Sequence, residues 1–172
     1  MAVTAPRHVE DIPLPGPANR FDYQSVDPAG GRLYISHMNA GRLIVFDLDS
    51  SHVLSEIGGV DRATGVWAVP EHHAVFVSAA GRHELVAVDD RTHQVVARVG
   101  GIRFPDGIAY APAEHKVFVS DESADADVVV DGMGIWVGGP APGRWRRHSD
   151  GAIHRVQRVL SGCRMRTRGE QP

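Results

Sequence analysis

Cysteine is nearly absent from this sequence, because Cys163 is the only one among 172 residues. A single thiol cannot form an intramolecular disulfide or supply the cysteine cluster of a structural zinc site. Long apolar runs are missing as well: no 18 uncharged apolar residues occur in succession, and the N-terminus has no apolar stretch of signal-peptide length. The sequence therefore predicts a soluble, cytoplasmic chain that does not enter a membrane, although a longer homologue could be exported.

The signatures of common enzyme classes are also missing. The sequence has no nucleophile elbow, no HExxH, no phosphate-binding P-loop and no GxGxxG. The glycine pairs at 58–59 and 100–101 are separated by one repeat period, so we interpret them as turns rather than cofactor loops. We therefore expect a protein without catalytic residues and without a required cofactor.

The sequence does contain a repeat of 42 residues. A run that reads RLYIS at 32–36 returns as AVFVS at 74–78 and as KVFVS at 116–120, each time without a gap. A fixed period of this length is typical of repeat architectures, in which each unit packs on copies of itself.

Each repeat contains four short runs of β-branched and aromatic residues, separated by Gly, Pro, Asp, Asn and His. This pattern favours strands joined by tight turns. In the second run an aromatic residue (Tyr34, Phe76 or Phe118) lies between aliphatic residues, so both faces of that strand must be covered. The fourth run is interrupted by polar residues, as expected for an exposed outer edge. Radial stacking of four-stranded blades produces this order from buried to exposed.

We therefore predict an all-β fold: a partial β-propeller of about three four-stranded antiparallel blades, followed by an irregular or disordered C-terminal tail. The blades are expected at about 20–60, 61–102 and 103–131. In this interpretation the propeller unit spans 1–131, and the Arg- and Gly-rich tail spans 132–172.

The repeats resemble the YVTN-type, YncE-like β-propeller repeats found in many bacterial proteins, a WD40-like kind of repeat. The resemblance covers about residues 20–131 and rests on RLYIS, KVFVS, the FPDGIA motif at 104–109 and the strands that end at Asp47 and Asp89. It implies a truncated member of the family, because a complete ring has about seven blades. It also implies a binding scaffold, since the repeat is not tied to one activity.

The charge is unevenly distributed. Residues 1–131 contain 10 Lys and Arg against 19 Asp and Glu, whereas residues 132–172 contain 8 Arg against 2 acids. Three interpretations of the basic tail are open: a nucleic-acid-binding segment, a disordered solvating tail, or a stretch translated out of frame from a longer propeller gene. We prefer the third, because the composition changes abruptly in mid-repeat and no nucleic-acid-binding motif accompanies the charge. Translation of the other two frames of the DNA would test it.

Propellers commonly bind ligands on the face where the outer strand of one blade turns into the inner strand of the next. The loops between the second and third strands reach the same face. A convergent set of Arg and Asp there would bind a polar small molecule or a peptide, and solvated loops are the alternative interpretation. The candidate ligand-binding residues are Arg20, Asp22, His37, Asp61, Arg62, Arg103, Asp106, Asp121 and Glu122.

Asp121, Glu122 and Asp125 are the acids best suited to bind a hard cation such as calcium. A polar turn is the alternative interpretation, because their spacing is not that of an EF-hand. Propellers of the gluconolactonase type use such a metal to polarise a lactone. A degraded metal-dependent hydrolase of the lactonase type is therefore the alternative to a non-catalytic scaffold for an unknown small molecule or protein.

Two further expectations concern structural residues. Asp47, Asp89 and Asp131 recur in one phase, and we interpret them as turn residues that bond the backbone two positions on. The histidines in the turns between first and second strands, including His72 and His115, are expected to be exposed.

The terminal repeats lack a neighbour on one side, so we predict self-association through exposed blade edges. Residues 11–16 fall one period before the first outer strand, in the phase of the outer strand of a preceding blade.

Overall fold

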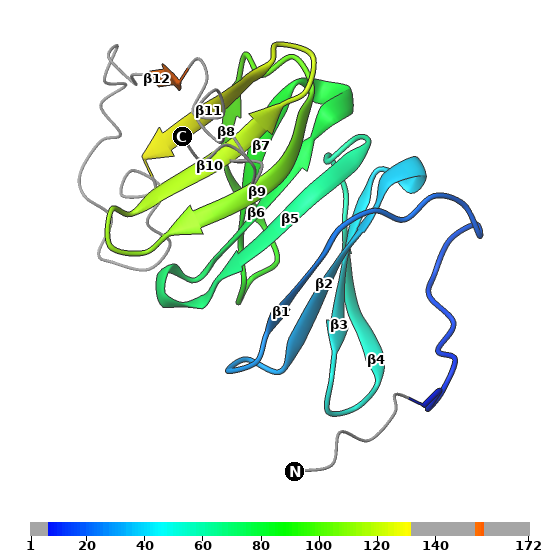
Figure 1. The fold of residues 1–172 in the computed structure, drawn as a ribbon. Helices are drawn as coiled ribbons and strands as arrows, with labels where there is room; N and C mark the ends of the chain where they lie inside the picture. The colour runs from blue at the N-terminus through cyan, green and yellow to red at the C-terminus, as the bar shows by residue number, and fades with distance from the viewer. Residues whose placement is uncertain (1–6, 132–153, 157–172) are drawn as a thin grey trace, which may run out of the picture.

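The computed structural model describes residues 7–131 and 154–156, which form three four-stranded antiparallel sheets (Figure 1). The first sheet contains β1 (Gln24–Asp27), β2 (Arg32–His37), β3 (Arg42–Asp47) and β4 (His52–Ile57). The second contains β5 (Ala63–Val69), β6 (Ala74–Ala79), β7 (Glu84–Asp89) and β8 (Val95–Gly100). The third contains β9 (Pro105–Ala111), β10 (Lys116–Asp121), β11 (Ala126–Asp131) and β12 (His154–Val156).

Each sheet follows the chain from an inner to an outer strand, and the inner strands β1, β5 and β9 lie side by side. Short 3-10 turns follow three strands: η1 (Met38–Ala40), η2 (Pro70–His72) and η3 (Ala80–Arg82). The predicted fold class, a partial propeller of three four-stranded antiparallel blades, is confirmed. We call the sheets blade 1, blade 2 and blade 3. In the part of the chain that the structure describes, no helix is long and apolar enough to cross a membrane.

Strand β12 is an addition to the predicted pattern, which placed no strand after residue 131. It pairs with β11, with His154 opposite Val129 and Val156 opposite Asp127, and takes the outer position of blade 3. The physical reason is that β11 would otherwise leave a row of backbone N–H and C=O groups unpaired at its outer edge. The rest of the predicted tail lies outside the described residues.

Two apolar layers join the blades. We call the side of a blade on which Tyr34 and its equivalents Phe76 and Phe118 lie its back face, and the side on which Ile35 and its equivalents Val77 and Val119 lie its front face. The first layer packs the back face of blade 1 on the front face of blade 2 and includes Tyr34, Leu43, Val45, Val75, Val77, Val86 and Val88. The second repeats this packing between blades 2 and 3 and includes Phe76, Leu85, Ala87, Val117, Val119, Val128 and Val130. Each fully buried apolar side chain stabilises the fold by about 1.5–3 kcal/mol.

The predicted role of the repeated aspartates is confirmed for Asp47 and Asp89. A carboxylate oxygen of Asp47 accepts backbone hydrogen bonds from the second and third residues after it, both at 2.9 Å. Asp89 does the same at 2.8 Å. Asp27 accepts two such bonds at 3.0 and 2.9 Å in the turn between β1 and β2. The equivalent positions of the other two repeats hold Val69 and Ala111. These turns fix the hairpins of blades 1 and 2.

Residues 10–15 lie across the front face of blade 1, on the side away from blade 2 (Figure 1). Residues 10–15 form no strand, although residues 11–16 lie one repeat period before the outer strand of blade 1 in the sequence. Leu14 packs against the cluster of Ile35, Ile44 and Phe46. The segment therefore contacts blade 1 itself.

Candidate functional site

One end of the three sheets collects the connections that the sequence singled out. Each loop between second and third strands is tied to the connection that precedes its blade. The amides of Asn39, Gly81 and Glu122 donate to the carbonyls of Arg20, Asp61 and Phe104, at 3.2, 2.9 and 3.1 Å. We call this end the loop face; it comprises residues 16–23, 38–41, 58–62, 80–83, 101–104 and 122–125, with the adjoining ends of the inner strands.

Three carboxyl groups gather at the inner edge of the loop face. Asp106 at the start of β9 is hydrogen-bonded to Glu122, and Asp22 of blade 1 is close enough for its charge to act on Asp106. Burial raises the pKa of the Asp106 carboxyl to about 6, and the charges of Glu122 and Asp22 add to that effect. We call Asp22, Asp106 and Glu122 the acidic cluster. Two of its members come from blade 3 and one from blade 1.

Tyr23 crosses the gap between these blades. A Cβ atom built on Gly107 of β9 would lie 3.9 Å from the Tyr23 hydroxyl oxygen. The charge of Asp106 is the largest cause that raises the pKa of Tyr23, followed by burial and by Asp22. The phenol thus lies beside the acidic cluster and adds a hydrogen-bond donor to it.

Gly65 of blade 2 allows the inner strands β5 and β9 to approach each other closely. A Cβ atom at this position would lie 1.9 Å from the carbonyl oxygen of Asp106, which no side chain tolerates. Tyr23, Gly65 and Gly107 share one phase of the repeat. The tyrosine was missed as a site residue. The signal was a large aromatic residue where the other two repeats have glycine.

Several predicted site residues are engaged with their neighbours on the loop face. Arg20 pairs with Asp22 at 3.4 Å, and Asp61 pairs with Arg82 at 3.3 Å. The guanidinium of Arg62 lies 5.2 Å from the ring centroid of Phe104, in the next blade. Arg103 is exposed and donates its backbone amide to Asp121. Exposed ion pairs contribute about 0–1 kcal/mol to folding stability, so these pairs determine the charge distribution of the loop face more than the stability of the fold.

His37 and Asp121 are buried, unlike the other predicted site residues. His37 lies 2.6 Å through Nε2 from Asn19 Oδ1, and its ring stacks on Phe21 with centroids 4.1 Å apart. The Asp121 carboxylate accepts the backbone amides of Arg103 and Phe104, both at 3.0 Å. Both side chains therefore fix connections beneath the loop face.

Asp121, one of the three acids considered for a calcium site, accepts hydrogen bonds from the backbone of the β8–β9 connection. Among residues 7–131 and 154–156, no group of three or more His, Cys, Asp or Glu side chains is placed to hold a metal ion.

Two turn histidines at the opposite end of the sheets, His72 and His115, differ from the prediction of exposed side chains, whereas His73 is exposed as predicted. His72 and His115 are half-buried. His72 Nε2 lies 2.7 Å from the Tyr110 hydroxyl and 3.3 Å from His115 Nδ1. Two turns on adjacent blades meet here, which the position of each histidine in its own turn did not indicate.

Comparison with known proteins finds the fold and no family. No family model matches the sequence, and no curated protein matches it. Hydrazine synthase of Kuenenia stuttgartiensis is similar with a TM-score of 0.61 and 19% identity, over 65% of this chain and 32% of that chain. The structure of U3-55K gives 0.60 and 12%, over 69% and 36%. The WD40 repeats of RRP9 give 0.55 and 12%, over 63% and 32%.

This chain therefore spans about a third of the length of each of these structures. At these identities the similarity shows a β-propeller fold of the WD40 kind.

Proposed function

We propose that this chain is a non-catalytic β-propeller scaffold of the YVTN type, which binds a partner protein through basic side chains that reach the acidic cluster. The observation that carries the proposal is the convergence of Asp22, Tyr23, Asp106 and Glu122 from blades 1 and 3. The similarity to WD40-type propellers supports a role in protein interaction.

The chemistry of the cluster favours a cation that donates several hydrogen bonds. Asp106 and Glu122 share a hydrogen bond, which leaves further carboxylate lone pairs for an incoming donor. The guanidinium of arginine offers five N–H donors in a planar fork, and charge-assisted bonds to carboxylates are about twice as strong as neutral ones. Loss of the shared proton on approach of the cation would strengthen the contact, because a deprotonated pair carries more negative charge.

A titration with a short arginine-containing peptide, followed by calorimetry at low and at physiological salt, tests this proposal. We expect binding that weakens with salt. Asp106→Asn and Glu122→Gln should each weaken it by about tenfold, or 1.4 kcal/mol. Asp61→Asn is the matched control: Asp61 is an acid on the same face that already pairs with Arg82, and its loss should leave affinity unchanged. Equal affinity for all four proteins, or for a peptide with glutamate in place of arginine, contradicts the proposal.

The lactonase alternative makes a different forecast. Stabilisation by calcium together with lactone turnover would favour a hydrolase, and the absence of both in the presence of peptide binding would favour the scaffold. We also propose that the protein is cytoplasmic and that the chain divides at residue 131 into a propeller unit and a tail. A proteolytic cut near residue 131 that leaves residues 20–131 intact would support this division.

A further inference from the structure

The front face of blade 1 has the side chains of a blade interface. Its apolar residues are Leu33, Ile35, Ile44, Phe46 and Val53. They share the phase of the valines that blades 2 and 3 use against the preceding blade. Among the described residues no sheet precedes blade 1.

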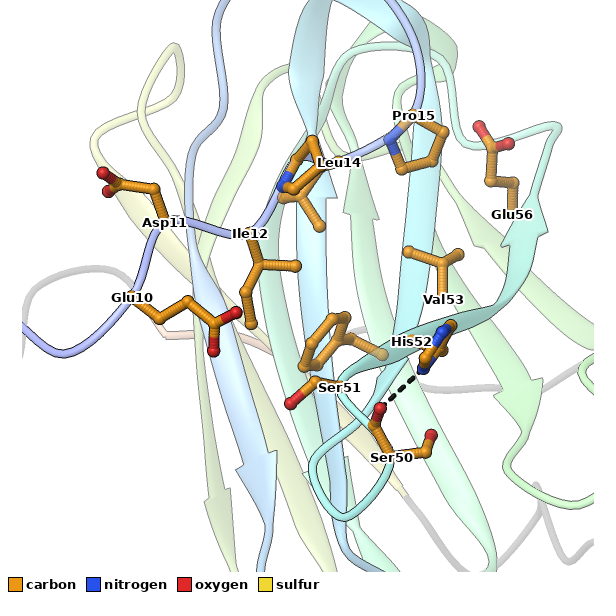
Figure 2. Close-up of a pocket in the computed structure, with 12 residues that line it drawn as sticks. Glu10, Asp11, Ile12, Leu14, Pro15, Ser50, Ser51, His52, Val53 and Glu56 are labelled. Atoms are coloured by element: carbon orange, nitrogen blue, oxygen red, sulfur yellow. Dashed lines mark hydrogen bonds between the residues drawn. The ribbon is translucent and has the colours of Figure 1, made fainter.

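The N-terminal segment covers this face incompletely. Residues 10–15 contribute Leu14 to the apolar cluster. An open pocket of about 840 Å³ remains between this segment, Phe46, the β3–β4 turn at 50–51 and the start of β4 at 52–53 (Figure 2). A blade docked on this face would fill that space, because packed protein interfaces between blades are as dense as a protein interior. The segment is therefore a poor substitute for a blade.

The back face of blade 3 carries the matching side chains. Phe118 and Val129 share the phases of Tyr34 and Val45, which are buried between blades 1 and 2. The strand β10 alternates half-buried and buried residues, and Val117 and Val119 point to blade 2. Phe118 therefore lies on the side of blade 3 away from blade 2.

The front face of blade 1 and the back face of blade 3 lack the apolar residues that the other blade faces have next to the loop face. Leu43 and Val60 lie in the first apolar layer, and Leu85 and Ile102 lie in the second. In the third repeat, Asp127 stands at the position equivalent to Leu43 and Leu85. Before the first repeat, Ala18 stands at the position equivalent to Val60 and Ile102. Arg20 lies two residues from Ala18, and its side chain is 62% exposed. A polar pair, Asp127 with Arg20, would thus replace the apolar pair.

We propose that the front face of blade 1 is the docking surface for the back face of blade 3 in a second copy of this chain. Docking displaces residues 10–15 and brings Asp127 of one copy to Arg20 of the other. This contact is head-to-tail, and such contacts close as rings or extend as filaments. Two copies supply about six blades, within the four to eight of closed propellers. The inference does not rest on ligand binding at the loop face.

Sedimentation equilibrium of the full chain over a wide concentration range tests the docking. For wild type we expect masses of at least twice the 18.6 kDa of one chain. Leu33→Glu on the front face and Phe118→Glu on the back face should each weaken association by at least about tenfold. Val96→Glu is the matched control, because Val96 is an exposed residue of the outer strand β8. It should leave association unchanged.

Mixing the two variants distinguishes head-to-tail from symmetric contacts. Leu33→Glu keeps the back face and Phe118→Glu keeps the front face, so their mixture should form a heterodimer that neither variant forms as a homodimer. A Phe118→Glu protein that still dimerises alone would overturn the proposal in favour of a front-to-front contact. A wild type that stays monomeric throughout would also overturn it.

A charge exchange keeps the test decisive if Phe118→Glu fails to fold. Arg20→Asp and Asp127→Arg should each weaken association, and the double variant should restore it, because the pair is then reversed. No restoration in a folded double variant, as judged by circular dichroism, would contradict the predicted contact. Leu14→Ser should strengthen association, since the competing segment then binds the front face less well.

Discussion

Blade 2 and the two outer blades have similar strand patterns and very different surroundings. All six residues of β6 in blade 2 are buried, whereas β10 in blade 3 alternates half-buried and buried residues. In blade 1, β2 begins with two half-buried residues, and its front face is covered only by residues 10–15 among the described residues. The comparison shows that burial in this molecule is decided by which neighbour a blade has, because the side chains themselves repeat.

Truncation of one phenylalanine in each environment gives the largest expected effect. Phe76→Ala, between blades 2 and 3, should lower the free energy of unfolding by about 3–5 kcal/mol, since the close-packed layer cannot refill the cavity. Phe46→Ala should cost less, because Phe46 already borders a pocket into which residues 10–15 can collapse. Urea denaturation of both variants measures the difference. Equal losses would mean that the front face of blade 1 is as well packed as the interior.

The close approach of inner strands provides the second test. Gly65→Ala should destabilise the protein by about 1–3 kcal/mol, because the new methyl group would meet the Asp106 carbonyl and force β5 from β9. It should also weaken peptide binding at the loop face by moving Asp106.

Gly100→Ala is the control for this substitution. Its Cβ would meet only Glu84 Cγ at 4.0 Å, and Gly100 has no positive φ. We expect an effect of less than about 0.5 kcal/mol, as for most surface changes. Thermal unfolding of the pair checks both values, and equal melting temperatures would contradict the close approach.

Strands β1 to β11 could be predicted from sequence because each is encoded locally, in a period that repeats without gaps; β12 lies after the last repeat and could not. The acidic cluster could not be predicted as a unit. Asp22 and Asp106 were both candidates, yet the position of Asp106 depends on the close approach of β9 to β5, which requires that residue 65 has no side chain. Tyr23 was overlooked for the same reason.

His37 and Asp121 show a second limit of sequence analysis. Each is the last residue of a second strand, beside a loop that the repeat places at the loop face, so both were candidates for ligand binding. The structure instead uses them to satisfy the connections: His37 contacts Asn19 and Phe21, and Asp121 accepts two backbone amides. Buried backbone N–H groups need partners, and the sequence pattern does not show which side chain will supply them.

The pH dependence of stability gives the smallest expected effect and compares the inner strands directly. Blade 2 has Thr64 in the phase where blades 1 and 3 have Asp22 and Asp106. The folded-state pKa of Asp106 is about 6, above its ordinary value of 3.8. The folded state therefore holds the proton more tightly than the unfolded state, and stability falls as pH rises from about 4 to about 6.

Asp106→Asn should remove this decline, so that its stability relative to wild type increases across that interval. Glu122→Gln should reduce the decline, since it takes away a neighbouring negative charge that raises the Asp106 pKa. Urea denaturation at several pH values measures both trends, and Asp61→Asn, which changes an exposed acid already paired with Arg82, should follow the wild-type curve. An Asp106→Asn curve parallel to wild type between pH 4 and pH 6 would mean that Asp106 ionises as an ordinary surface acid, and the convergence of blades 1 and 3 would then carry no electrostatic cost.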